Sequence, residues 1–265
     1  MKGVCASRYS VLELIALSLA DAQQAARAGA HRIELVGTME KEGLAPSPQL
    51  VEEIVATVPI RVRPMVRIDA GFAAQKDRLP QLKELVRDFT NAGAEGVVFG
   101  YLAPDKSLAL DYMAELAHEL RGQASFTIHR AIDAVASACD KGAADEEDTQ
   151  KIATHRYLAA WQQLLGMTPG PDVVLTAGSS RGITVGLDNL RAAIELFPEA
   201  AELIQAGGGL KLEHIPALAD LGIRQFHVGS GVREDGTFDS AISAEKVKLW
   251  LDAIAAQCNR DLANQ

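Results

Sequence analysis

The segment 125–130, Ser-Phe-Thr-Ile-His-Arg, combines a buried strand pattern with two reactive side chains. Successive side chains of a strand point to opposite faces, so Phe126 and Ile128 share one face and His129 lies on the other. An imidazole can transfer a proton near neutral pH, and a guanidinium can hold an anion. The segment therefore predicts one wall of a polar cavity, with His129 and Arg130 at its carboxyl-terminal rim.

Six further strands that the sequence predicts place polar side chains on the same inward face. An interior that serves only packing carries mostly valine, isoleucine and leucine. Because buried charge destabilises a fold unless it is paired or used, the polar set favours a functional site. The alternative is structural, with Glu13 and Glu34 paired to Arg63 and Arg67 as satisfied buried ions. The set comprises Glu13, Glu34, Arg63, Arg67, Thr176, Gln205 and His227.

Two glycine-rich segments end the seventh and eighth predicted strands. Glycine lets the backbone approach an anion closely and direct N–H groups at it, and barrels often bind a phosphate between these two loops. The alternative is that the glycines only form tight turns. Arg233 follows them, either as a charged partner of the anion or as a solvated loop residue. The expected anion-binding residues are Gly207, Gly208, Gly209, Gly229, Ser230 and Gly231.

Strand-like and helical segments alternate along the whole chain. Eight βα units within about 250 residues predict a (β/α)8 TIM-like barrel, as a single domain over residues 1–265. An open doubly wound sheet is the competing fold, and it would more often have fewer strands. The predicted strands span residues 11–17, 32–36, 61–67, 96–102, 125–130, 172–176, 202–206 and 225–228. The predicted helices span residues 20–28, 48–56, 76–92, 108–120, 157–165, 187–196, 212–221 and 244–257.

One connection is longer than the others. A variable insert at about 134–171 separates the fifth and sixth predicted strands, and its acidic run 143–148 favours a solvated surface segment. In (β/α)8 barrels the chemistry takes place at the carboxyl ends of the strands, where the polar rim is expected. The insert follows one of those ends.

The overall charge disfavours polyanionic partners. The formal net charge is −9, so the phosphates of nucleic acids and of anionic membranes would be repelled. No stretch reaches the roughly 18 apolar residues of a membrane span. A local basic cluster can still bind a small anion, and the expected partner is a small anionic ligand or a metal ion.

Cysteine usage indicates a reducing compartment. The chain has three widely separated cysteines, Cys5, Cys139 and Cys258, and no CxxC motif. An odd number of cysteines does not form a disulfide framework, and the N-terminal segment lacks a signal-peptide pattern. We therefore expect a cytoplasmic protein.

Several motifs together resemble those of the CutC family, over roughly residues 12–232. They are Ala-Gly-Ala-His-Arg-Ile-Glu-Leu (28–35), Gly-Leu-x-Pro-Ser (43–47), Arg-Pro-Met-Val-Arg (63–67), Phe-Thr-Ile-His-Arg-Ala-Ile-Asp (126–133), Leu-Thr-Ala-Gly (175–178) and Ala-Gly-Gly-Gly (206–209). The His-Arg-Ala-x-Asp segment is the most specific of them. The resemblance implies a TIM-like barrel that is cytoplasmic, often a homo-oligomer, and linked to copper homeostasis and copper binding.

The resemblance also directs attention to particular site residues. It favours Glu34, Arg67, His129, Arg130 and Asp133 as a catalytic set, with Thr176 and His227 among the ligand-binding residues. In an enzyme acting on a small anionic, phosphorylated metabolite, His129 and Glu34 would move protons. Arg67 and Arg130 would hold the anion, and Asp133 would orient Arg130 or His129. We expect Glu34 and Arg67 to pair across the mouth, because consecutive strands are usually neighbours.

The implied copper function conflicts with the residues of this chain. Copper(I) prefers thiolate and thioether ligands. Where family members commonly carry cysteines, this chain has Ile15, Ala16 and Val36, and Met65 is the remaining thioether at the expected rim. Three functions stay open. They are copper binding, which the resemblance implies, acid–base chemistry on a small anion, and ligand sensing without turnover.

Overall fold

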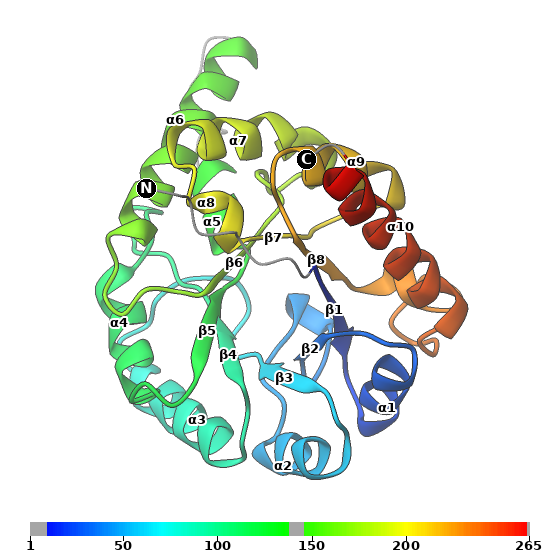
Figure 1. Cartoon of the computed structure of the whole chain (residues 1–265). Helices are drawn as coiled ribbons and strands as arrows, with labels where there is room; N and C mark the ends of the chain where they lie inside the picture. Colours follow the sequence, from blue (N-terminus) through cyan, green and yellow to red (C-terminus); the bar gives the residue numbers. More distant parts are fainter. Residues whose placement is uncertain (1–9, 138–145, 264–265) are drawn as a thin grey trace, which may run out of the picture.

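The computed structural model describes residues 10–137 and 146–263 and confirms the (β/α)8 barrel. Eight parallel strands lie at the centre, and the helices form a ring around them (Figure 1). The strands follow one another in the order β3-β2-β1-β8-β7-β6-β5-β4. Their bounds are β1 Val11–Ala16, β2 Arg32–Leu35, β3 Arg61–Pro64, β4 Gly96–Phe99, β5 Ser125–Ile128, β6 Val173–Thr176, β7 Ile204–Ala206 and β8 Gln225–Val228.

Each predicted helix overlaps an α-helix of the structure, whereas the short helices at 131–137 and 200–203 were not predicted. The α-helices are α1 Leu19–Arg27, α2 Pro48–Thr57, α3 Leu79–Asn91, α4 Leu110–Glu119, α5 Ala131–Ser137, α6 Glu146–Leu165, α7 Ile183–Leu196, α8 Ala200–Leu203, α9 Ile215–Asp220 and α10 Ala244–Ala263. The 3-10 turns are η1 Glu40–Glu42, η2 Leu212–His214 and η3 Ser230–Val232. Within the described residues, no helix is both long and apolar enough to cross a membrane.

The insert at 134–171 is more helical than expected. The predicted helix at 157–165 begins eleven residues earlier, because α6 starts at Glu146 and takes in the end of the acidic run. The rest of the run, 143–145, lies outside the described residues. In Figure 1 the first turns of α6 project beyond the ring of helices.

The register of the sheet determines which side chains face the barrel interior. Paired residues of parallel strands point to the same side. Glu13 is paired with His227 and Ile15 with Glu34, so these four side chains share the inward face. The outward residues, such as Phe126, belong to the main apolar core between the strands and the helices.

Strand β6 has the opposite phase from the one expected. Thr127 is paired with Val173, and Leu175 with Gln205, so Leu175 faces inward and Thr176 faces outward toward the helices. The sequence Val173–Thr176 starts with three apolar residues, so alternation alone does not define its inward face. The expected inward placement of Thr176 is therefore wrong.

Strands β3 and β4 meet at a weakly bonded seam. They are joined by a bridge between Met65 and Val98 rather than by a ladder of named pairs. Across the seam, Arg63 donates hydrogen bonds to Glu95 at 2.6 Å and to Asp172 at 2.9 Å. Glu95 and Asp172 precede β4 and β6, so this ionic network lies at the amino-terminal end of the barrel. Arg63 therefore does not belong to the functional rim.

Candidate active site

A cavity of about 650 Å³ opens at the carboxyl ends of the strands. This volume is within the range of small-molecule sites. Its polar lining includes Glu34, Arg67, His129, Arg130, Asp133, Ser180, Lys211, His227 and Ser230, together with Gly208, Gly209, Gly229 and Gly231. Its apolar lining comprises Ile15, Val36, Met39, Met65, Phe72, Ala134, Leu175, Leu210, Val228 and Phe238. The structure thus brings together all five residues of the expected catalytic set.

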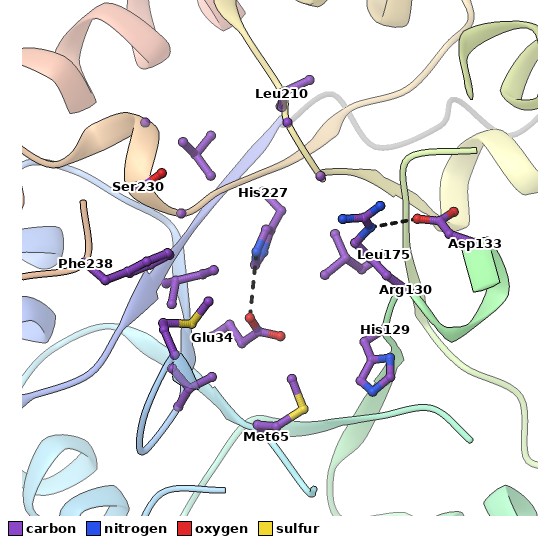
Figure 2. Close-up of a pocket in the computed structure, with 18 of the residues that line it drawn as sticks. Glu34, Met65, His129, Arg130, Asp133, Leu175, Leu210, His227, Ser230 and Phe238 are labelled. Atoms are coloured by element: carbon purple, nitrogen blue, oxygen red, sulfur yellow. Dashed lines mark hydrogen bonds and ion pairs between the residues drawn. The ribbon is translucent and has the colours of Figure 1, made fainter. Parts of the chain in front are cut away.

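Glu13, His227 and Glu34 form a buried chain that leads into the cavity. Nδ1 of His227 lies 2.7 Å from Oε1 of Glu13. Nε2 of His227 lies 3.7 Å from Oε2 of Glu34, and Figure 2 marks this second contact with a dashed line. Glu13 also accepts a hydrogen bond from Arg32. The other oxygen of Glu34, Oε1, is buried and accepts no hydrogen bond from the described residues. A bound ligand can therefore use it.

The charges in this chain shift its pKa values in opposite directions. Burial alone would raise the pKa of Glu13, but Arg32 and His227 hold it well below the usual range. Burial and the charge of Glu13 raise the pKa of Glu34 to about 7, against the effect of His227. Burial alone would lower the pKa of His227, but the hydrogen bond to Glu13 and the charge of Glu34 raise it. The carboxyl of Glu34 therefore changes its protonation state near neutral pH, beside an imidazole that the two glutamates make more basic than usual.

His129 differs from His227 in charge and in tautomer. Its Nδ1 accepts a hydrogen bond from the backbone N–H of Ala131 at 3.1 Å, so the proton of the neutral ring is on Nε2. Burial, with Arg67 and Arg130 nearby, lowers its pKa well below the usual value. Nε2 is buried and makes no hydrogen bond within the described residues. His129 is thus a neutral hydrogen-bond donor in the wall of the cavity.

Gly100, which directly follows the end of β4, leaves space for this imidazole. A Cβ at Gly100 would lie 2.9 Å from Nδ1 of His129 and 3.0 Å from Cβ of Ala131. On the other side, the ring of Phe72 is tilted against the imidazole, with centroids 4.8 Å apart. These contacts restrict the orientation of His129.

Arg130 is held in place by Asp133, as expected. Its Nε donates to Oδ2 of Asp133 at 2.8 Å, and its Nη2 donates to the carbonyl of Ser179 at 3.1 Å. Its other terminal nitrogen, Nη1, makes no hydrogen bond within the described residues and lies beside Gly208, where a Cβ would come within 2.7 Å of it. Arg130 therefore presents one free donor edge next to the glycine-rich loop.

The Asp133 carboxylate that holds Arg130 is itself held by residues at the end of β6. It accepts hydrogen bonds from Thr176 Oγ1 at 2.6 Å and from the N–H of Ala177 at 3.0 Å. Thr176 also lies 2.9 Å from the hydroxyl of Tyr157 on α6. Thr176, predicted to bind the ligand, does not line the cavity and instead supports the carboxylate that positions Arg130.

Backbone N–H groups of both glycine-rich loops are available at the cavity. Among the described residues, no partner accepts a hydrogen bond from the N–H of Gly208, Gly209, Ser230 or Gly231. Gly207 differs: its N–H donates to the carbonyl of Thr176 at 3.2 Å, and it does not line the cavity. The loops thus have donors for an anion, and whether they bind one stays a prediction.

Arg67 holds a loop of the protein in place. Arg67 follows the end of β3 at Pro64, and it donates to the carbonyl of Gly43 at 2.9 Å and lies over the ring of Phe72 at 5.4 Å. Within the described residues it makes no ion pair with Glu34, whose ion-pair partner is His227. The expected Glu34–Arg67 pair is therefore wrong, because carbonyls of the loop before α2 hold the guanidinium.

Arg233 lies outside the site. It is 2% exposed, pairs with Asp21 at 2.7 Å and donates to the carbonyl of Ser240 at 2.7 Å. These contacts fasten η3 to the start of α1, so Arg233 is a structural residue. It is neither a ligand-binding group nor a solvated one.

The donors in the cavity can be compared with the ligands that copper(I) prefers. Met39 and Met65 supply thioethers, but the described lining residues include no cysteine. The backbone N–H on Nδ1 of His129 keeps the proton on Nε2, which blocks coordination there. His227 is a possible ligand through Nε2, beside Glu34. This donor set does not fit a tight copper(I) thiolate site. Cys5 and Cys139 lie outside the described residues.

Several residues of the cavity were missed by the sequence analysis. Met39, Phe72 and Phe238 come from loops between elements, where no periodicity relates a side chain to the barrel axis. Ser180 and Lys211 likewise follow strand ends within loops. The signal that could have found them is their position shortly after strands two, three, six, seven and eight, since such loops form the mouth of a barrel.

The comparisons with known proteins agree with the barrel. A model of the CutC family matches residues 10–147. The CutC family protein of Yersinia pseudotuberculosis is 28% identical over 221 residues, which cover 83% of this chain and 78% of that protein. The one from Proteus mirabilis is 28% identical over 236 residues, covering 86% and 82%. The crystal structure of a protein from Streptococcus agalactiae, named for copper homeostasis and CutC, has a TM-score of 0.63 at 21% identity, covering 83% and 98%. The chain belongs to the CutC family.

Proposed function

We propose that the mouth of the barrel is the active site of an enzyme that moves a proton on a small anionic metabolite. The observation that carries this proposal is the buried carboxylate of Glu34, which has one oxygen without a partner and a pKa of about 7. A carboxylate whose pKa is close to neutral is a suitable general base. His227, held by Glu13, lies next to it, and its positive charge favours the ionised form of the Glu34 carboxylate.

His129 supplies the second part of the chemistry. As a neutral donor through Nε2, it can form a hydrogen bond to a carbonyl oxygen of the substrate. When Glu34 removes a proton from the neighbouring carbon, the C–H electron pair moves toward that oxygen, where the hydrogen bond stabilises the developing charge. Returning a proton to carbon completes the cycle, so no oxidant or reductant is needed.

Arg130 would hold the anionic end of the substrate. Its free Nη1 lies beside Gly208, and Gly209, Ser230 and Gly231 line the same cavity. Arginine and backbone N–H groups both suit carboxylates and phosphates. The site would therefore fix the anion at one end and expose the adjacent carbon to Glu34.

Deuterium exchange tests the proposal. The protein is incubated in D₂O with pyruvate, dihydroxyacetone phosphate or 4-methyl-2-oxopentanoate, and ¹H NMR follows the loss of carbon-bound hydrogen. We expect faster exchange than in buffer for at least one probe, rising with pH through about 7 as Glu34 ionises. Glu34→Gln should remove the acceleration. The control variant Glu195→Gln, at an exposed position of α7, should keep it. No acceleration with any probe, or an active Glu34→Gln protein, would contradict the proposal.

Copper binding is the second candidate, and it follows from the family and from the name of the Streptococcus agalactiae protein. The thioethers of Met39 and Met65 at the cavity favour it, and the constrained imidazole of His129 opposes it. We predict no tight copper(I) site in the mouth. A titration against a competing copper(I) chelator checks this. A stoichiometric site that disappears in both Met65→Leu and His227→Ala would overturn the prediction and favour copper.

A further inference from the structure

One half of the cavity mouth is apolar. Ile15, Val36, Met65 and Val98 form a buried cluster separate from the main core, and Leu17, Met39 and Phe238 pack against it while partly exposed. Ile15 and Val98 are the last inward residues of β1 and β4, and Val36 and Met65 directly follow the ends of β2 and β3. The charged Glu13 and Glu34 precede Ile15 and Val36 by two residues each, on β1 and β2. The apolar wall thus begins where the charged interior ends.

The polar donors lie on the other half. Arg130, Gly208 and Gly209 line this half, from the segments that follow β5 and β7. Figure 2 shows Phe238 and Arg130 on opposite sides of the cavity, with Glu34 and His227 between them. A molecule that filled the cavity from end to end would therefore meet an anion-binding edge, then the proton-transfer pair, then an apolar surface.

We propose that the ligand of this cavity is an amphipathic anion: a carboxylate or phosphate ester whose carbon skeleton bears an apolar substituent. The anionic group binds at Arg130, and the substituent packs on Ile15, Val36 and Met39. A cavity of about 650 Å³ is large for a bare phosphate or for pyruvate. Partly exposed Met39 and Phe238 gain from burial only when an apolar group covers them.

This inference rests on the proposed function and adds the class of ligand. A binding experiment tests the ligand class separately from proton transfer. Calorimetry compares 4-methyl-2-oxopentanoate with pyruvate, and butyl phosphate with inorganic phosphate. Each pair shares its anionic group and differs in the apolar part. We expect the apolar member of at least one pair to bind at least about tenfold more tightly. The pair that shows the preference identifies the anionic group as carboxylate or phosphate.

Isosteric variants then locate the preference. Val36→Thr and Met39→Gln keep the size of the side chain and make the wall polar, so the preference should fall severalfold. Val185→Thr on α7 and Leu249→Gln on α10, both exposed, are the matched controls and should leave it unchanged. Equal affinities within both pairs, no binding of any probe at millimolar concentration, or a preference that survives both wall variants would overturn the inference.

The exchange assay distinguishes this failure from that of the proposed function. Apolar selectivity without deuterium exchange would remove the enzymatic proposal and keep the ligand class. Exchange on pyruvate without apolar selectivity would keep the enzyme and remove the amphipathic ligand.

Discussion

Among single residues, His129 provides a direct link between protonation and stability. It is 4% exposed, and its pKa in the folded protein lies well below the usual value of about 6.5, because burial and two nearby arginines oppose a positive charge. The unfolded chain therefore binds a proton at His129 when the pH falls below about 6.5, while the folded chain does not. His129 stabilises the fold above that pH and less so below it.

The variant His129→Gln should remove this dependence. Glutamine cannot take up a proton, so the free energy of unfolding should fall less between pH 7 and pH 5 than in the unaltered protein. The difference is at most about 1.4 kcal/mol per pH unit. Urea titrations at several pH values measure it, with the exposed His118→Gln as control. Identical pH dependence in the unaltered and His129→Gln proteins would mean that His129 titrates normally.

The two neighbouring glycines, Gly208 and Gly209, allow a matched test of the Arg130 position. Both have positive φ angles, +92° and +71°, so alanine strains the backbone at either site by about 1 kcal/mol. A Cβ at Gly208 would lie 2.6 Å from Cζ of Arg130, whereas a Cβ at Gly209 would meet nothing within 4 Å. The two substitutions thus differ mainly in whether they displace the guanidinium.

We therefore expect Gly208→Ala to weaken phosphate binding at least about fivefold, which corresponds to the loss of a charged hydrogen bond. Gly209→Ala should bind phosphate about as tightly as the unaltered protein. Its loss of thermal stability should be similar to that of Gly208→Ala. Calorimetric titration with inorganic phosphate and thermal melts supply both quantities. If the two variants bind phosphate equally, Arg130 does not form part of the anion site.

At the level of elements, the sequence predicted where the strands lie. It predicted which side chains face inward for some strands but not for others. Strands with a charged residue between apolar ones, such as Glu34 in β2 and His227 in β8, have a clear inward face. Strand β6 begins with three apolar residues, and the pairing of Thr127 with Val173 determines its phase instead. Since that pairing is a property of the closed sheet, alternation could not have assigned Thr176.

The cavity lining shows the same limit. Residues on strands were found, but Phe238 lies in the loop after η3. Arg233 donates to the carbonyls of Phe238 and Ser240 and lies 5.2 Å from the centre of the Phe238 ring, which helps to hold this loop at the cavity. Loop side chains of this kind have no spacing rule. The polar residues that line the rim were predictable from the sequence, and the apolar wall beside them was not.

Arg67 acts at the element scale, as the anchor of the loop between β2 and α2. Its guanidinium donates to the carbonyls of Lys41 and Gly43 and is 2% exposed. Arg67→Ala should lower the free energy of unfolding by about 2–3 kcal/mol, since buried carbonyls lose charged donors. Arg67→Lys keeps one charge and should lose less. Chemical denaturation measures both, and a fall below about 0.5 kcal/mol for alanine would rule out the anchoring role.

For the whole molecule, the seam between β3 and β4 decides how the barrel closes. Arg63, fully buried, reaches across it to Glu95, to Thr127 at 2.8 Å and to Asp172. Gly96 leaves space for it, because a Cβ there would lie 3.0 Å from its Nε. One guanidinium thus joins segments that precede or form β3, β4, β5 and β6, in a place where the ladder of backbone hydrogen bonds is short.

Arg63→Met tests this closure. Methionine fills much of the volume but leaves two carboxylates without their partner, so the free energy of unfolding should fall by about 3–5 kcal/mol. The pKa of Glu95, which Arg63 lowers against the effect of burial, should rise toward its usual value. A carboxyl whose pKa is lower in the folded than in the unfolded chain stabilises the fold at a pH above the unfolded pKa, and this stability is lost on acidification. The variant should therefore lose less stability between pH 6 and pH 4 than the unaltered protein. Urea titrations at the two pH values measure this, with Arg87→Met, which breaks the partly exposed ion pair with Glu119, as control. A loss as small as that of the control would mean that packing alone closes the barrel.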